Sequence, residues 1–110
     1  IAEFERSLMT PSPFDSYLRG DKSAVSRQVQ HGYRLFKKYG CVSCHQGVGV
    51  GGNLFQKFGA LVSYYKDKEI SRVDYGRSEL TKDPEDMHVF KVPSLRNVAK
   101  TSPYFHNGSV

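Results

Sequence analysis

The spacing of apolar positions predicts three helical segments in the N-terminal part of the chain. Residues 1–8 place apolar side chains at i, i+3 and i+7 with charged residues between them, as at the end of an amphipathic helix. The prolines in residues 10–13 interrupt that pattern. A short helical turn is predicted at 14–18, and a longer helix at 27–39 with Ser26 as its N-cap.

The pattern after this region predicts loops rather than long regular elements. Residues 46–58 are rich in glycine and indicate a loop. Residues 60–65 are apolar and favour an extended segment, whereas residues 66–84 are polar and indicate a surface loop. Pro93 suits the first position of a short helix over residues 94–99.

One short stretch, Cys41-Val-Ser-Cys44-His45, has the spacing of a c-type haem attachment site. Each thiol can form a thioether bond with a vinyl group of the porphyrin. The adjacent imidazole then binds the iron as the proximal ligand. The chain has two cysteines in all, so this one site would use both.

Two other kinds of site contain a Cys-x-x-Cys pair, namely a redox-active dithiol and a structural zinc site. A redox dithiol motif normally follows a strand in a βαβ pattern, and no such pattern precedes Cys41. A zinc site needs four ligands, yet the chain has no second cysteine pair. His31, His88 and His106 do not form a histidine pair at zinc-binding spacing. The motif therefore favours haem.

Composition and charge change this interpretation little. With 110 residues, 38% of them hydrophobic and 25% charged, the chain has the size of one small globular domain. No apolar run approaches the ~20 residues of a membrane span. The net charge of +5 first suggests nucleic acid, but the basic residues are dispersed and two haem propionates would offset part of the charge. We therefore predict neither nucleic-acid binding nor a membrane span.

Residues after the motif are candidates to contact the haem. The glycines of residues 46–58 can lie close against a flat ligand, because glycine adopts conformations that other residues avoid. Phe55 and Phe58 are candidates to cover the haem face, with ordinary core packing as the alternative. Arg96 is a candidate partner of a haem propionate, with a plain surface position as the alternative.

The sixth ligand of the iron is not evident in the sequence. A low-spin electron-transfer haem has two axial ligands, and in cytochromes c the second is commonly methionine. The chain offers Met9 and Met87, and neither lies in a loop just before a C-terminal helix. We therefore expect an all-α, cytochrome c-like helical domain with long loops that lacks its C-terminal helix.

Several stretches resemble one protein family closely. They are Ile1-Ala-Glu-Phe-Glu-Arg-Ser-Leu8, Thr10-Pro-Ser-Pro-Phe-Asp-Ser-Tyr-Leu-Arg-Gly-Asp21, Gly40-Cys-Val-Ser-Cys-His45, Gly51-Gly52, Phe90-Lys-Val-Pro-Ser-Leu-Arg-Asn97 and Thr101-Ser-Pro-Tyr-Phe-His-Asn-Gly108. Together they resemble the bacterial dihaem cytochrome c peroxidases, in particular the C-terminal, high-potential haem domain of that family. The resemblance implies the end of an inter-domain helix and a linker at 1–25, and a C-terminally truncated cytochrome c-type haem domain at 26–110. It also implies that the distal methionine lies beyond Val110.

The resemblance also implies a function for the whole protein. A small cytochrome c or a cupredoxin would deliver electrons to this haem. The electrons would pass to a second haem in the N-terminal peroxidatic domain, where hydrogen peroxide is reduced to water. Cys41 and Cys44 would carry the thioether bonds and His45 the iron, and this segment alone would not be a competent peroxidase. Haem attachment at this motif implies a periplasmic location, and a homodimer is a further prediction.

A calcium site is implied by the resemblance alone. In the family a Ca²⁺ lies between the two domains, and backbone carbonyl groups at the positions of Thr101 and Pro103 are among its ligands. By sequence pattern, both residues are ordinary turn residues. His106 corresponds to a histidine near the domain interface, with a structural or electron-path role rather than a catalytic one.

Two other functions remain open. In the first alternative, the chain is a stand-alone monohaem electron carrier or haem-binding module that uses Met87 or a histidine as its distal ligand. In the second, it is part of a related dihaem enzyme that oxidises protein side chains, in which a tyrosine replaces the distal methionine. The sequence beyond both ends of the chain would separate these functions, because a second haem motif or a following methionine would be visible there.

Overall fold

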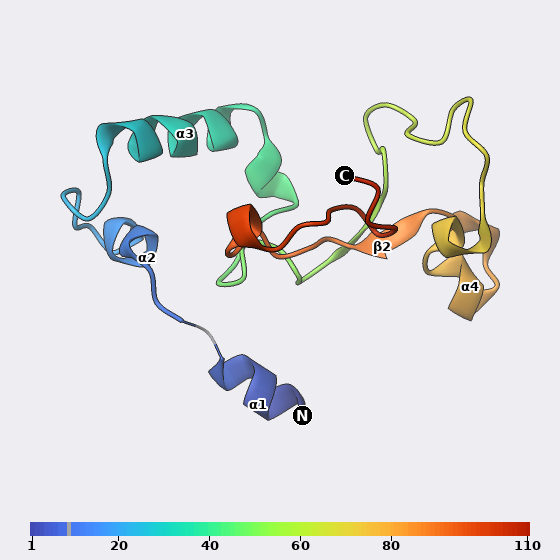
Figure 1. The fold of residues 1–110 in the computed structure, drawn as a ribbon, viewed down its shortest axis with the longest axis horizontal. Coiled ribbons are helices and arrows are strands. Elements are labelled where there is room, and N and C mark those ends of the chain that lie inside the picture. Colours follow the sequence, from blue (N-terminus) through green and yellow to red (C-terminus); the bar gives the residue numbers. More distant parts are fainter. Residues whose placement is uncertain (9) are drawn as a thin grey trace. The chain divides into compact units, whose positions relative to one another are not determined.

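The computed structural model describes residues 1–8 and 10–110, so the candidate ligand Met9 lies outside the described residues. The chain divides into two compact units, Ile1–Gly40 and Cys41–Val110, each with its own internal contacts (Figure 1). Within the described ranges, no helix is both long and apolar enough to cross a membrane.

The first unit is helical, as the sequence predicts. Its described residues form α1 (Ala2–Ser7), α2 (Pro13–Leu18) and α3 (Arg27–Lys38). The Ser26 hydroxyl accepts a hydrogen bond from the Val29 N–H at 3.3 Å, which confirms Ser26 as the N-cap of α3.

Helix α2 begins one residue before its predicted start. Pro13 occupies its first turn, where the N–H that proline lacks would have no partner within the helix. The Asp15 carboxylate accepts hydrogen bonds from both the N–H and the hydroxyl group of Ser12, each at 2.7 Å. The prolines therefore end one helical pattern and also help to start the next helix.

Aromatic side chains hold α2 and α3 together. The rings of Phe14 and Tyr17 meet the edge of the Tyr33 ring at centroid distances of 5.2 and 6.1 Å. The Lys37 ammonium group lies 4.6 Å from the centroid of the same Tyr33 ring. Tyr33 of α3 thus packs against α2, whereas Val29 of the same helix stays exposed.

The second unit contains a small sheet, which corrects the all-α prediction. Strand β1 (Phe55–Lys57) pairs antiparallel with β2 (Val89–Lys91), and Gln56 lies opposite Phe90. Each strand has three residues, too few for an alternating pattern to be recognised in the sequence. The chain is therefore mainly helical with loops and a two-stranded sheet in its described residues (Figure 1).

The remaining helices of the second unit are about one turn long. They are η1 (Cys41–Ser43), η2 (Arg72–Tyr75), α4 (Ser78–Thr81), η3 (Pro84–Asp86) and η4 (Val98–Lys100). The predicted surface loop at 66–84 thus contains η2 and α4. The predicted helix at 94–99 is wrong in extent, since only η4 forms, and residues 60–65 form bends and turns instead of an extended strand.

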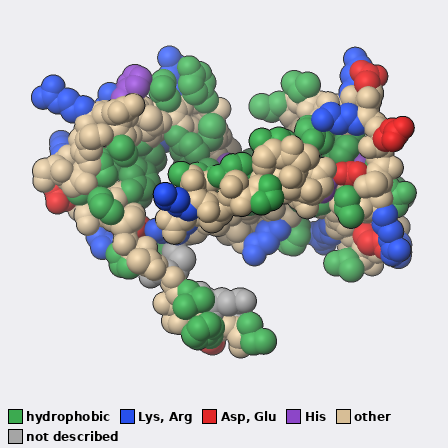
Figure 2. All heavy atoms as spheres, in the orientation of Figure 1, with side chains coloured by type: hydrophobic (Ala, Val, Ile, Leu, Met, Phe, Trp, Pro, Cys, Tyr) green, Lys and Arg blue, Asp and Glu red, His purple; other side chains and the backbone are tan. Residues whose placement is uncertain are grey.

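Much apolar surface of the chain is exposed. Among the described residues no large side chain is fully buried, and Tyr65 and Val92 are the buried hydrophobic side chains. Leu61, Val62 and Leu80 are almost fully exposed. Hydrophobic side chains accordingly appear over much of the face seen in Figure 2.

A buried carboxylate joins three segments of the second unit. Asp74 of η2 accepts a hydrogen bond on Oδ1 from His106 Nε2 at 2.6 Å. Its Oδ2 atom accepts hydrogen bonds from the N–H and the hydroxyl group of Ser71, each at 2.8 Å. The backbone carbonyl of Asp74 accepts a hydrogen bond from His88 Nδ1 at 2.7 Å. The hydrogen bond from His106 and those from Ser71 lower the pKa of the Asp74 carboxyl to about 2.

Aromatic rings enclose the buried carboxylate and its partners. The His106 ring stacks on Phe90 with centroids 4.3 Å apart, and the His88 ring stacks on Tyr65 at 3.9 Å. Burial raises the pKa of Tyr65 to about 12, so its phenol stays neutral at physiological pH. The Tyr65 hydroxyl lies 3.5 Å from His106 Nε2.

The lowered pKa of Asp74 predicts that the fold loses stability in acid. Its folded-state pKa of about 2 lies below the ordinary value of 3.8. The ionised carboxylate therefore stabilises the fold above pH 3.8, and this contribution disappears as the pH falls through 3.8 towards 2. We expect Asp74→Asn to lower the urea midpoint at neutral pH and to flatten its decline in acid. Glu69→Gln, at an exposed position, is the control. Parallel pH profiles for Asp74→Asn and the unsubstituted protein would contradict this account.

Candidate functional site

The turn η1 orders the Cys-x-x-Cys-His motif. The N–H groups of Cys44 and His45 both donate to the Cys41 carbonyl, at 3.3 and 2.9 Å. In such a turn, residues three positions apart lie on the same face. Both cysteines are free thiols, with Cys41 exposed and Cys44 half-buried. Two thiols on one face of a single turn suit two bonds to one ring.

Two backbone segments that are distant in sequence meet next to the motif. The glycine-rich loop (residues 46–52) lies against the segment that follows β2. The Gly52 N–H donates to the Val92 carbonyl at 2.7 Å, and the Leu95 N–H donates to the Val50 carbonyl at 3.1 Å. The glycine-rich loop is therefore held in place by hydrogen bonds, as an extension of the β1–β2 pairing.

Two side chains strengthen this contact. The Ser94 hydroxyl donates to the Gly49 carbonyl at 2.5 Å, and Arg96 Nε donates to the Val48 carbonyl at 2.6 Å. The half-buried Arg96 side chain is thus bound to the loop that follows the haem motif. Its role as a partner of a haem propionate stays a prediction.

Gly51 lies where the loop, the segment after β2 and His45 come together. Gly51 is buried and has a φ of +126°. A Cβ atom at this position would lie 2.1 Å from the Pro93 carbonyl oxygen and 3.3 Å from His45 Nδ1. Glycine is required here both for its backbone conformation and for lack of space. The His45 Nδ1 atom, itself buried, is therefore packed against a backbone that carries no side chain.

The residues of the motif fit a covalently bound haem. Cys41 and Cys44 supply two reduced thiols on one turn, and His45 supplies an imidazole whose environment is fixed by Gly51. These are the three side chains that would hold the porphyrin and its iron. Their assignment stays a prediction, for which the geometry of the turn and loop is the structural support.

The two predicted aromatic haem contacts lie in different surroundings. The half-buried Phe58 ring lies 4.7 Å from the Tyr64 ring and 5.2 Å from the Phe105 ring, which corresponds to the core-packing alternative. Phe55 in β1 is exposed, and the Arg77 guanidinium carbon lies 5.3 Å from its ring centroid. Contact of either ring with haem stays a prediction.

Thr101 and Pro103, the predicted calcium ligands, follow η4 and are exposed. In the described part of the chain, no backbone N–H group donates a hydrogen bond to either carbonyl oxygen. Carbonyl oxygens of exposed turns are ligands that Ca²⁺ prefers. This short segment therefore fits the role implied by the resemblance, which stays a prediction.

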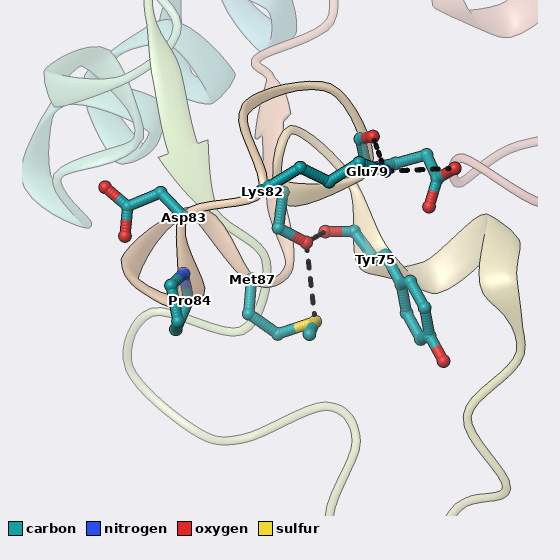
Figure 3. Close-up of a pocket in the computed structure, with 7 residues that line it drawn as sticks. Tyr75, Glu79, Lys82, Asp83, Pro84 and Met87 are labelled. Carbon is teal, nitrogen blue, oxygen red and sulfur yellow. Dashed lines mark hydrogen bonds and ion pairs between the residues drawn. The ribbon is translucent and has the colours of Figure 1, made fainter.

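Met87, the distal ligand considered for a monohaem carrier, lines a surface cavity of about 280 Å³ (Figure 3). The Ser78 hydroxyl donates to the Tyr75 carbonyl at 2.8 Å, and the Met87 sulfur lies 3.7 Å from the same hydroxyl oxygen. Lys82 also lines the cavity, with Nζ 2.5 Å from the Glu79 carbonyl oxygen. The Met87 side chain therefore packs among residues of its own segment, which disfavours it as an iron ligand.

Sequence reasoning missed Asp74, because residues 66–84 have the composition of a polar surface loop. A local signal was available, since Ser71-x-x-Asp74 has the spacing of a capping box in which a carboxylate reaches back to the N-cap. The partner His106 lies 32 positions further along the chain. No sequence pattern connects the two.

The sequence is closely similar to known peroxidases, although no protein-family model matches it. It is 50% identical over 111 residues to the cytochrome c peroxidase of Escherichia coli K12, covering all of this chain and 24% of that protein. It is 48% identical over 109 residues to the cytochrome c551 peroxidase of Nitrosomonas europaea, covering 98% of this chain and 31% of that protein. The chain thus spans between about a quarter and a third of these relatives, in their C-terminal part.

Among solved structures, the chain resembles a MauG-like protein associated with microbial copper homeostasis. The TM-score is 0.72 at 33% identity, covering 90% of this chain and 31% of that one. The likeness supports the mainly helical, loop-rich fold of the described residues.

Gly51→Ala should destabilise the site by more than the cost of placing alanine at a positive φ, because the added methyl group also has no space. The added Cβ atom would meet the Pro93 carbonyl oxygen at 2.1 Å, so the loop must move away from the segment after β2. We expect a loss of more than about 1 kcal/mol in unfolding free energy and a lower haem content per chain. Urea unfolding and haem absorbance measure the two effects. Gly20→Ala is the matched control, because Gly20 has a similar φ of +114° and nothing within 4 Å of the added atom. Equal effects of the two substitutions would refute the close-contact explanation.

Met87→Leu should leave the iron coordination unchanged. Its sulfur lies 3.7 Å from the Ser78 hydroxyl, which donates instead to the Tyr75 carbonyl, and leucine has nearly the same volume as methionine. The expected loss of stability is therefore less than about 1.5 kcal/mol. The measurement is the long-wavelength absorption band that is characteristic of methionine-ligated ferric haem, in the oxidised protein. Disappearance of that band in Met87→Leu would identify Met87 as the distal ligand.

Proposed function

Because the chain belongs to the bacterial cytochrome c peroxidase family, we propose that it is the haem domain through which electrons enter a dihaem peroxidase. In this proposal the whole protein reduces hydrogen peroxide to water with electrons from a small redox protein. One observation carries the proposal: a Cys-x-x-Cys-His turn stands beside a glycine-rich loop held by hydrogen bonds, in a chain about half identical to peroxidases.

The residues of the chain have positional roles in this function. When bound, the haem supplies reversible one-electron chemistry at its iron. Cys41 and Cys44, two free thiols, would attach the ring to η1, and His45 would provide an imidazole for the iron. Gly51 lets the backbone pack against that imidazole, and this packing restricts the ring orientation of His45. A fixed ligand orientation keeps the rearrangement on each electron transfer small.

The proposal includes partners that the chain itself does not contain. The donor is a small cytochrome c or a cupredoxin, and the acceptor is a second haem in an N-terminal peroxidatic domain. Residues 1–25 would be the end of the inter-domain helix and the linker, and residues 26–110 the haem domain. The large exposed apolar side chains, Leu61 and Leu80 among them, support packing against further protein. A periplasmic location, a homodimer and Ca²⁺ at Thr101 and Pro103 complete the proposal.

A second candidate function is oxidation of protein side chains by a dihaem enzyme. The chain resembles one MauG-like structure at 33% identity, a protein associated with copper homeostasis. The peroxidases are more similar, at 43–50% identity, so peroxide reduction is the better supported function. A stand-alone monohaem carrier is less supported, because the relatives are much longer than this chain and Met87 packs among residues of its own segment.

The test uses the full-length protein with Cys41→Ala and Cys44→Ala combined. We expect intact mass to fall by one haem while the second haem remains. Peroxide turnover with a reduced small cytochrome c should fall at least about 100-fold, or about 2.7 kcal/mol in barrier height, because the point at which electrons enter is lost.

Ser43→Ala, within the same turn, is the control and should keep both haems. Full turnover with the doubly substituted protein would reject the proposed electron route. A protein that carries one haem before substitution would instead favour the monohaem carrier.

A further inference from the structure

The last residues of the chain form a closed loop. In this loop (residues 104–110) the N–H of Tyr104 is hydrogen-bonded to the Val110 carbonyl, and the Val110 N–H donates to the Tyr104 carbonyl at 3.5 Å. The Gly108 N–H donates to the Phe105 carbonyl at 3.3 Å and forms the turn. These three hydrogen bonds tie the two ends of the 104–110 loop together.

His106 anchors this loop in the second unit. Its Nε2 atom donates to Asp74 Oδ1 at 2.6 Å, and the two side chains are 11% and 8% exposed. The His106 ring also stacks on Phe90, and the neighbouring Phe105 ring meets Phe58 at 5.2 Å. The carboxylate is itself held by two hydrogen bonds from Ser71. The Asp74 carboxylate is therefore held by His106 on one oxygen and by Ser71 on the other.

The 104–110 loop in turn fixes the position of Pro103. A Cβ atom built on Gly108 would lie 3.3 Å from Pro103 Cγ, so the proline ring rests directly on the Gly108 backbone. On the other side, the Tyr104 hydroxyl is hydrogen-bonded to the Val98 carbonyl at the start of η4. The segment from Thr101 to Pro103 thus runs between η4 and the anchored loop.

We propose that Asp74 and His106 are positioning residues for the carbonyl oxygens of Thr101 and Pro103, and that they set the calcium affinity of the full-length protein. This inference rests on the calcium site of the proposed function. Cation coordination by backbone carbonyls depends on distances held within tenths of an ångström, so movement of the 104–110 loop would carry Pro103 out of place.

Stability alone does not account well for a buried pair of this kind. Removing two ionisable groups from water costs free energy that their attraction only partly returns, and apolar replacements are often as stable. A hydrogen-bonded pair does, however, fix one relative position, which the ring contacts of His106 with Phe90 and of Phe105 with Phe58 alone would leave freer. Asp74–His106 is thus better explained as a geometric constraint.

The experiment measures calcium dissociation constants of the full-length, haem-loaded protein by titration calorimetry after chelation. His106→Phe keeps a ring against Phe90 but removes the hydrogen bond to Asp74, and we expect calcium binding to weaken at least tenfold. His106→Gln, whose amide N–H can reach Asp74, should restore most of the affinity. His31→Phe, at an exposed position of the first unit, should have no effect.

A second pair of variants covers the case in which His106→Phe does not fold. Gly108→Ala would press on the Pro103 ring and should also weaken calcium binding, whereas Gly20→Ala adds a methyl group at a positive φ with nothing within 4 Å. Unchanged affinity in both His106→Phe and Gly108→Ala overturns the inference. An unsubstituted protein that binds no Ca²⁺ overturns both the inference and the calcium site. The proposed electron route would be unaffected, because the cysteine variants test it separately.

Discussion

The close approach of Gly51 to the Pro93 carbonyl is the contact on which the haem-binding region depends. It brings the loop after the motif against the segment after β2, and hydrogen bonds on either side extend it from Val48 to Leu95. Two of these bonds join backbone groups, and the side chains of Ser94 and Arg96 donate the other two. The surroundings of His45 therefore follow from the backbone geometry together with these two side chains.

Local signals in the sequence predicted the parts of the structure that depend on neighbouring residues. The Cys-x-x-Cys-His spacing identified the candidate haem site, and Ser26 correctly marked the start of α3. The family resemblance, carried by short quoted stretches, agrees with relatives at 43–50% identity. The glycine-rich loop was predicted to lie close against the haem, which stays a prediction. The sequence did not indicate that Gly51 meets both Pro93 and His45.

Features that join distant residues could not be predicted in the same way. The three-residue strands β1 and β2 carry no alternating pattern, so the all-α prediction was wrong on this point. The Asp74–His106 contact joins the polar residues 66–84 to the turn-rich residues after Thr101. The two side chains become buried only when the chain folds, so the sequence does not show it. The expected helix at 94–99 gave way because residues 94–96 bond to the glycine-rich loop instead. Tertiary hydrogen bonds outweighed the local preference that Pro93 suggested.

Asp74 receives hydrogen bonds from Ser71, His88 and His106 on three different atoms. Substitutions at these three positions are consequently not independent, because each changes the surroundings of the same residue. Once one partner is lost, a second loss should cost less than it would in the intact protein. In evolutionary terms, the four positions form an epistatic group, and a substitution that is harmless in one relative can be damaging in another.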